Sequence, residues 1–79
     1  MDCEAIKQLI QQGLPEATVE ITGDDGVHFS ATVVSQAFEG VSTLKRHRMV
    51  YATLGDKMGG EIHALALRTL SVAESQSAH

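Results

Sequence analysis

The histidines are the side chains of this sequence that could take part in the most kinds of chemistry, because an imidazole nitrogen binds metals and exchanges protons near neutral pH. The four histidines are His28, His47, His63 and His79. His28 follows the turn-forming segment 23–26, and His63 follows the glycine pair 59–60. If each begins a strand and the strands are parallel neighbours, about 4.8 Å apart, both imidazoles lie at one sheet edge. There they could bind a single metal ion.

Two histidines make only half of a metal site. Zinc and the iron of iron–sulfur clusters each take four ligands. His28 and His63 therefore have two interpretations: each is a structural residue at a strand end, or together they form a half-site that another molecule completes. The second interpretation favours a binding module over a self-contained metalloenzyme.

A basic run, Lys45-Arg46-His47-Arg48, occupies the first turns of a predicted helix. The helix dipole disfavours cations at that end by a few tenths of a kcal/mol each. One interpretation is a solvated face whose aliphatic stems cover apolar surface. The other is a recognition patch for phosphate, a peptide carboxylate or an acidic partner. We expect such a patch to flank the histidine edge.

The sequence lacks an arrangement typical of hydrolases. Ser30, Ser35 and Ser42 have no G-x-S-x-G context, and Cys3 has no histidine near it in sequence. We therefore expect a chain that does not act as an enzyme by itself.

The pattern of apolar residues predicts an α/β (α+β) fold of order α-β-β-α-β. Helices are expected at 2–12 and 42–58, strands at 17–22, 27–35 and 62–70, and a short helical turn at 35–38. Gly13 is expected to end the first helix in a left-handed conformation. The apolar stripe of the long helix is expected to be Leu44, Tyr51, Leu54 and Met58.

The connections between these elements predict a three-stranded mixed sheet with the helices on one face. A strand–helix–strand crossover makes the third strand parallel to the second. Residues 1–72 form the predicted domain, and 73–79 are expected to be a flexible C-terminal tail.

The composition limits the classes of function. The chain has 79 residues, enough for one domain, and a formal net charge of −4. An acidic chain binds nucleic acid poorly in general, and no apolar run reaches the roughly 20 residues of a membrane span. A single cysteine fits a reducing compartment, so we expect a cytoplasmic protein without a membrane partner.

Four segments of the sequence together resemble the BolA family. They are Gly23…Gly26-Val27-His28-Phe29, residues 34–40 (VSQAFEG), residues 45–54 (KRHRMVYATL) and residues 62–67 (IHALAL). The resemblance covers roughly residues 1–72 and implies a KH-like fold. It departs from the family pattern after Leu70, where a Glu-Trp-like ending is missing, and no G-x-x-G loop lies between Gly40 and Ser42.

The resemblance implies partnership with a monothiol glutaredoxin around a bridging [2Fe-2S] cluster. The glutaredoxin cysteine and glutathione would hold one iron, and His63 and His28 would hold the other. The isolated chain would then be a monomer without cofactor, and the cluster-bound form a heterodimer. The alternative is a DNA-binding transcriptional regulator that presents Arg46 and Arg48 to phosphates, which fits poorly with the net charge of −4.

Overall fold

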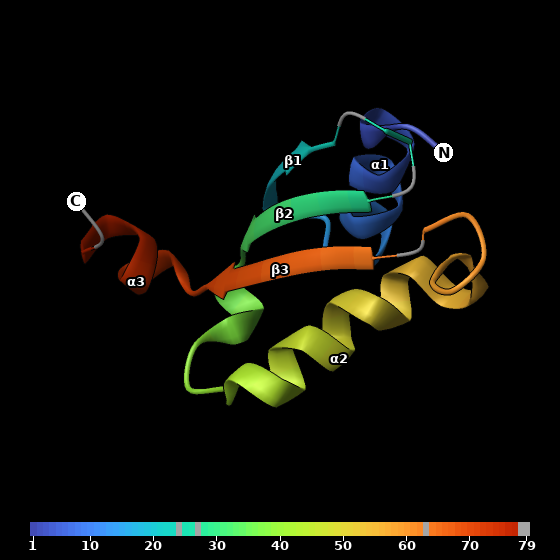
Figure 1. Cartoon of the computed structure of the whole chain (residues 1–79). Helices are drawn as coiled ribbons and strands as arrows, with labels where there is room; N and C mark the ends of the chain where they lie inside the picture. The colour runs from blue at the N-terminus through green and yellow to red at the C-terminus, as the bar shows by residue number, and fades with distance from the viewer. Residues whose placement is uncertain (24, 27, 63, 78–79) are drawn as a thin grey trace.

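The helices and strands follow the predicted order, with one more helix at the C-terminal end (Figure 1). The computed structural model describes residues 1–23, 25–26, 28–62 and 64–77. The elements are α1 (Cys3–Gly13), β1 (Thr18–Thr22), β2 (His28–Val34), the 3-10 helix η1 (Gln36–Phe38), α2 (Thr43–Leu54), the 3-10 helix η2 (Gly55–Lys57), β3 (Ala64–Leu70) and α3 (Val72–Ser77).

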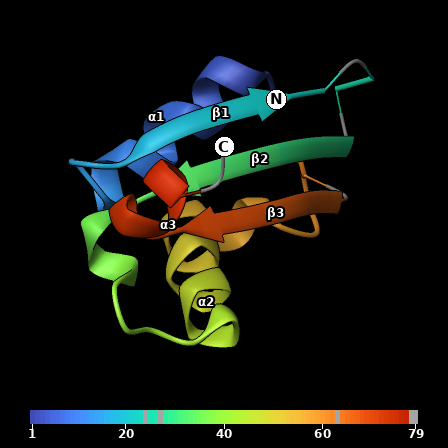
Figure 2. The same ribbon diagram turned by 90° about the vertical axis from the view of Figure 1, so that its left-hand side faces the viewer.

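The strands form a mixed sheet of order β1-β2-β3. β1 pairs antiparallel with β2, from Thr18 opposite Val34 to Thr22 opposite Ser30. β3 pairs parallel with β2, with Ala64 as the partner of His28 (Figure 2). The predicted mixed sheet and the parallel third strand are therefore confirmed.

Both long helices cover the same face of the sheet. In Figure 2, α1 and α2 lie behind the three strands. Strand residues at alternate positions point into the core on that side, as a period of two requires. The buried apolar residues are Ile6, Ile10, Leu14, Ala17, Val19, Phe29, Ala31, Val33, Phe38, Val50, Leu54, Ile62 and Leu65. On the opposite face Glu20, Ser30 and Ala66 are exposed, so the prediction of helices on one face is confirmed.

Helix α1 begins where the sequence predicts but ends differently. The Asp2 carboxylate accepts a hydrogen bond from the Ala5 N–H at 2.8 Å and caps the helix. Gly13 lies inside the helix, and Leu14 is the C-cap. A side chain at position 13 would collide with the methyl group of Thr53 on α2. The left-handed Gly13 is therefore corrected: this glycine lets the two helices approach closely.

Helix α2 is shorter than the predicted 42–58. Ser42 caps it as expected by accepting a hydrogen bond from the Lys45 N–H at 3.3 Å. The helix ends at Leu54 because Gly55 has φ 58° and ψ −132°, outside the helical region. The chain then turns through η2 towards β3.

The predicted apolar stripe of α2 is wrong at two positions. Leu44 is 61% exposed and Tyr51 36% exposed. The buried side chains are Arg46, Val50 and Leu54, which follow one another at intervals of four. Successive residues lie about 100° apart around a helix, so Leu44 and Tyr51 face outwards when this row faces the sheet.

Strand β3 is an edge strand and begins two residues later than predicted. Ile62 precedes it, is fully buried and forms an isolated bridge with Met58. Leu65 points into the core, whereas Ala64 and Ala66 are exposed on the open face.

The predicted flexible tail is helical over residues 72–77. The Ser71 hydroxyl accepts a hydrogen bond from the Glu74 N–H at 3.1 Å, and the Glu74 carboxylate accepts one from the Ser71 N–H at 2.8 Å. This reciprocal pair is a capping box, which fixes the start of α3. No helix in the described part of the chain is long and apolar enough to cross a membrane.

Candidate functional site

His28 is the first residue of β2, and its side chain is 61% exposed. Its register partner is Ala64, the first residue of β3. The predicted neighbourhood of the two strand starts is thus confirmed (Figure 1). His63 precedes Ala64 in the chain but lies outside the described residues.

Asp25 orients the His28 ring. One carboxylate oxygen lies 2.6 Å from His28 Nδ1, and the other accepts the His28 backbone N–H at 2.8 Å. An ionised carboxylate only accepts hydrogen bonds, so Nδ1 carries the proton. In the neutral imidazole the lone pair that can bind a metal is then on Nε2.

The residue pattern alone does not single out Asp25 as part of the site. An aspartate three residues before a histidine in a tight turn was the available signal, because aspartate commonly bonds backbone amides further along a turn. Only the structure shows that the same carboxylate also reaches the imidazole.

A recess of about 630 Å³ adjoins His28 on the face of the sheet opposite α1 and α2 (Figure 2). The small residues Gly23, Ser30, Ala64 and Ala66 line it together with Thr22 and Phe29. Their small side chains leave the space beside His28 accessible to another molecule. Within the described ranges, no group of three or more His, Cys, Asp or Glu residues is placed to hold a metal ion.

The basic run lies at the other end of the sheet from His28. Helix α2 connects two parallel strands, so it must run back along them and begin near their carboxyl ends (Figure 1). Val34 and His28 are the two ends of β2, separated by about 20 Å at about 3.3 Å per residue. The expectation that the basic run flanks the histidine edge is therefore wrong.

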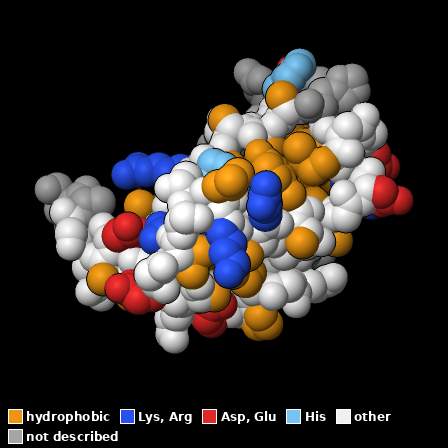
Figure 3. All heavy atoms as spheres, turned by 90° about the horizontal axis from the view of Figure 1, so that it is seen from below, with side chains coloured by type: hydrophobic (Ala, Val, Ile, Leu, Met, Phe, Trp, Pro, Cys, Tyr) orange, Lys and Arg blue, Asp and Glu red, His pale blue; other side chains and the backbone are white. Residues whose placement is uncertain are grey.

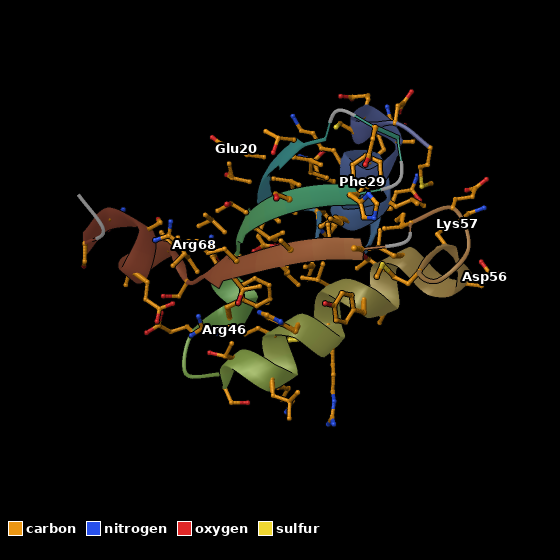
Figure 4. The ribbon with its side chains drawn as sticks, viewed as in Figure 1. Glu20, Phe29, Arg46, Asp56, Lys57 and Arg68 are labelled. Atoms are coloured by element: carbon orange, nitrogen blue, oxygen red, sulfur yellow. The ribbon has the colours of Figure 1, made fainter. Side chains whose placement is uncertain are left out.

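Arg46 does not share the surface of its basic neighbours. It is 8% exposed, and its Nε donates to the Val41 carbonyl at 2.7 Å. Its Nη1 donates to the Glu74 carboxylate at 2.6 Å, and the guanidinium carbon lies 5.8 Å from the centre of the Phe38 ring. Figure 4 shows Arg46 between α2 and the end of β3. This side chain holds α3 against the domain, so it is not available to a phosphate.

The exposed cations of the run are Lys45 and Arg48. Neither forms an ion pair with an acidic residue in the part of the chain that the structure describes. Together with Ser42, Leu44, Met49 and Ala52 they line a groove of about 570 Å³ on the outer side of α2. His47 is half-buried, and its ring meets the Tyr51 ring edge-on at 6.3 Å between centroids.

Two carboxylates are tuned by hydrogen bonds that favour the ionised form. The Arg46 guanidinium, with the Ser71 N–H, lowers the pKa of Glu74 from 4.5 to about 2. The Ser35 hydroxyl, with the Gln36 N–H, lowers the pKa of Glu16 against the opposing effect of burial. Both groups therefore favour the folded state only while they are ionised.

We predict that the chain loses stability in acid. A folded-state pKa below the unfolded value gives stability that is complete above the unfolded pKa and is lost as the pH falls through the folded one. For Glu74 this window runs from about 4.5 down to about 2. Urea unfolding measured across this range should show a falling free energy of unfolding.

The Glu74→Gln variant measures how much of the loss of stability in acid comes from the Glu74 carboxylate, which pairs with Arg46. It should be less stable than the parent chain at pH 7 and should lose less stability between pH 4.5 and 2. Glu16→Gln should keep the Glu74 contribution. An unchanged pH profile in Glu74→Gln would show that the pair does not couple α3 to folding.

The chain is similar to known proteins over most of its length. The family model described as BolA-like protein matches residues 8–74. BolA-like protein 1 of Homo sapiens is 35% identical over 79 residues, covering 89% of this chain and 58% of the relative. The chain thus spans little more than half the length of that relative.

Two further comparisons come from bacteria. The protein named DNA-binding transcriptional regulator BolA of Vibrio cholerae is 47% identical over 49 residues, covering 62% of this chain and 46% of the relative. The structure of a bolA protein homologue from Coxiella burnetii superposes with a TM-score of 0.86 and 44% identity. It covers 96% of this chain and 97% of the other.

Proposed function

Because this chain belongs to the BolA family, we propose that it is an adaptor that binds a monothiol glutaredoxin and shares a bridging [2Fe-2S] cluster with it. The observation that carries the proposal is the His28–Asp25 pair beside the recess at the start of β2. The pair presents an oriented imidazole on the accessible face of the sheet opposite α1 and α2.

Imidazole nitrogens, the donors that this chain would supply, are suitable ligands for iron. Rieske centres show that two imidazoles can replace two thiolates on one iron of a two-iron cluster, which raises its reduction potential. His28, through Nε2, and His63 would be the ligands from this chain, and Asp25 would hold the His28 ring in place. The cysteine of the glutaredoxin and glutathione would supply the remaining ligands.

The recess gives the partner room to approach. Ala64 and Ser30 flank His28 with side chains of one or two heavy atoms. A glutaredoxin that supplies its own ligands must approach the imidazole closely enough for both proteins to bind the same cluster. A face covered by helices would prevent this approach, and this face carries none of the long helices (Figure 2).

Reconstitution tests the proposal. The chain, a monothiol glutaredoxin and glutathione are mixed with iron and sulfide, and the visible absorption and circular dichroism of the isolated heterodimer are recorded. We expect a [2Fe-2S] spectrum that differs from that of the glutaredoxin homodimer. His63→Ala should abolish the heterodimer spectrum, whereas His47→Ala, which changes a histidine on α2, should leave it unchanged. An unchanged heterodimer spectrum in His63→Ala would disprove the ligand assignment.

The second candidate function is DNA-binding regulation by the outer side of α2. Exposed Lys45 and Arg48 favour it, and the Vibrio cholerae relative is named as such a regulator. The net charge of −4 and the internal position of Arg46 weigh against it. Two phosphate contacts would give a salt dependence with a slope of only about −1.8, and little duplex binding at physiological salt.

A further inference from the structure

We propose that the outer side of α2 is a docking surface for an acidic, amphipathic helical segment of a partner protein. The surface is the groove lined by Ser42, Leu44, Lys45, Arg48, Met49 and Ala52, called the α2 groove here. It runs along α2 from Ser42 to Ala52 and shares no lining residue with the recess beside His28 (Figure 1). The proposal therefore does not depend on the cluster proposed above.

Leu44 is the large apolar residue of the α2 groove that stays outside the core, whereas Met49 packs partly against the core. Leu44 is 61% exposed. Ser42 and not Leu44 caps α2, so capping does not require a leucine at this position. The inner row of α2 already packs on the sheet through Val50 and Leu54. Figure 3, which views the molecule from the α2 side, shows hydrophobic side chains gathered around Lys and Arg side chains. An exposed apolar surface of this kind indicates an interaction site.

The charges of the α2 groove select an acidic occupant. Lys45 and Arg48 are three residues apart, so they lie on the same side of the helix. Helix α2, TLKRHRMVYATL, contains no acidic residue that could neutralise them. The positive groove stands out on a chain whose net charge is −4. A helix with leucines on one side and glutamates beside them satisfies both features.

Nucleic acid and a second copy fit the α2 groove less well. A duplex contacts phosphates with many cations, whereas this groove offers two and an apolar floor. A second copy also carries a charge of −4 and would be repelled overall. A protein segment that combines leucine and glutamate can contact both the apolar residues and the two cations of the groove.

The separation of the α2 groove from His28 has a consequence for an adaptor. The recess beside His28 and the α2 groove share no lining residue, and α2 lies behind the sheet (Figure 2). A partner seated in the recess therefore leaves the α2 groove open. The chain can then hold two partners at once.

Fluorescence anisotropy tests the proposal with a designed probe and the full chain, without iron or glutaredoxin. The probe is a labelled 15-residue helical peptide with leucines at i, i+3, i+4 and i+7 and glutamates on both flanks. We expect saturable binding to the parent chain. The double variant Lys45→Glu/Arg48→Glu should weaken it at least about tenfold, and Leu44→Ser should weaken it by a similar factor.

The matched control is the double variant Lys57→Glu/Arg68→Glu. It makes the same change in net charge at two cations outside the α2 groove: Lys57, which is half-buried and pairs with Glu61, and the exposed Arg68 (Figure 4). Its affinity for the peptide should stay within about twofold of the parent value, since long-range charge effects alone are screened beyond roughly 10 Å at 0.1 M salt. Thermal melts of all variants check that the fold is intact.

Four outcomes would overturn the proposal. They are no saturable binding of the peptide, equal weakening in the control variant, undiminished binding of a peptide in which serine replaces leucine, and tighter binding of a 20-base-pair duplex that the peptide displaces. Sedimentation of the chain alone provides a further check. A dimer that Leu44→Ser dissociates would assign the α2 groove to a second copy.

Discussion

His28→Ala is expected to abolish the visible spectrum of the cluster-bound heterodimer while leaving the fold intact. The side chain is 61% exposed, so its removal should change the melting temperature by no more than about 2–4 °C, the equivalent of 0.5 kcal/mol. Loss of one of two protein ligands leaves an iron that this chain cannot hold. Absorption and circular dichroism of the reconstituted mixture measure the effect.

Asp25→Asn tests whether the orientation of the His28 ring matters for the cluster, because the ring itself is retained. The variant keeps the imidazole but replaces the carboxylate that accepts from Nδ1. Loss of such a partner of a ligating histidine typically costs 10–100-fold in metal affinity. We therefore expect a cluster that forms but transfers or decays faster. Asp56→Asn, a change of the same type in η2, is the control and should behave like the parent chain.

Two results would contradict this view of the His28 edge. A full heterodimer spectrum in His28→Ala would remove His28 from the ligand set. A normal cluster lifetime in Asp25→Asn, with His28→Ala inactive, would show that the Asp25 contact shapes only the turn.

Arg46→Ala is expected to destabilise the chain by about 3 kcal/mol, the upper end of the usual range for single substitutions, because the side chain is only 8% exposed and makes several contacts. The guanidinium donates to the Val41 carbonyl, pairs with the half-exposed Glu74 carboxylate and lies over the Phe38 ring. Its removal leaves the Val41 carbonyl without this donor and releases the start of α3. For a domain of this size the melting temperature should fall by roughly 15 °C.

Arg48→Ala is the matched control for Arg46→Ala, because it removes an exposed arginine two positions further along the same helix. It should change stability by less than about 0.5 kcal/mol. Equal effects of the two substitutions would mean that charge on α2, and not the contacts of Arg46, determines stability. Arg46→Ala should also lose part of the acid dependence that Glu74 provides, because Arg46 is the largest cause of the low pKa of Glu74 and the Ser71 N–H remains.

The residue pattern was sufficient for most of the fold. Alternation at Val19, Ile21, Phe29, Ala31 and Val33 is a local property of the strands, and the structure confirms their inward side. The parallel third strand followed from a general rule on crossovers, so it also needed no knowledge of contacts. The capping box at Ser71 and Glu74 was missed, because residues 73–79 were predicted to be a flexible tail although both residues stand at the required spacing.

Tertiary structure alone decided the roles of the charged residues. Lys45, Arg46 and Arg48 are equivalent in the sequence, and only the packing of α2 on the sheet directs Arg46 inwards to Glu74, 28 residues away. The same packing turns Leu44 outwards beside Lys45 and Arg48. The direction of α2 places the basic run at the end of the sheet opposite His28. Residue types and spacing therefore determined the order of helices and strands and the position of His28 at a strand start. The distribution of charge over the surface depends instead on contacts between residues far apart in the chain.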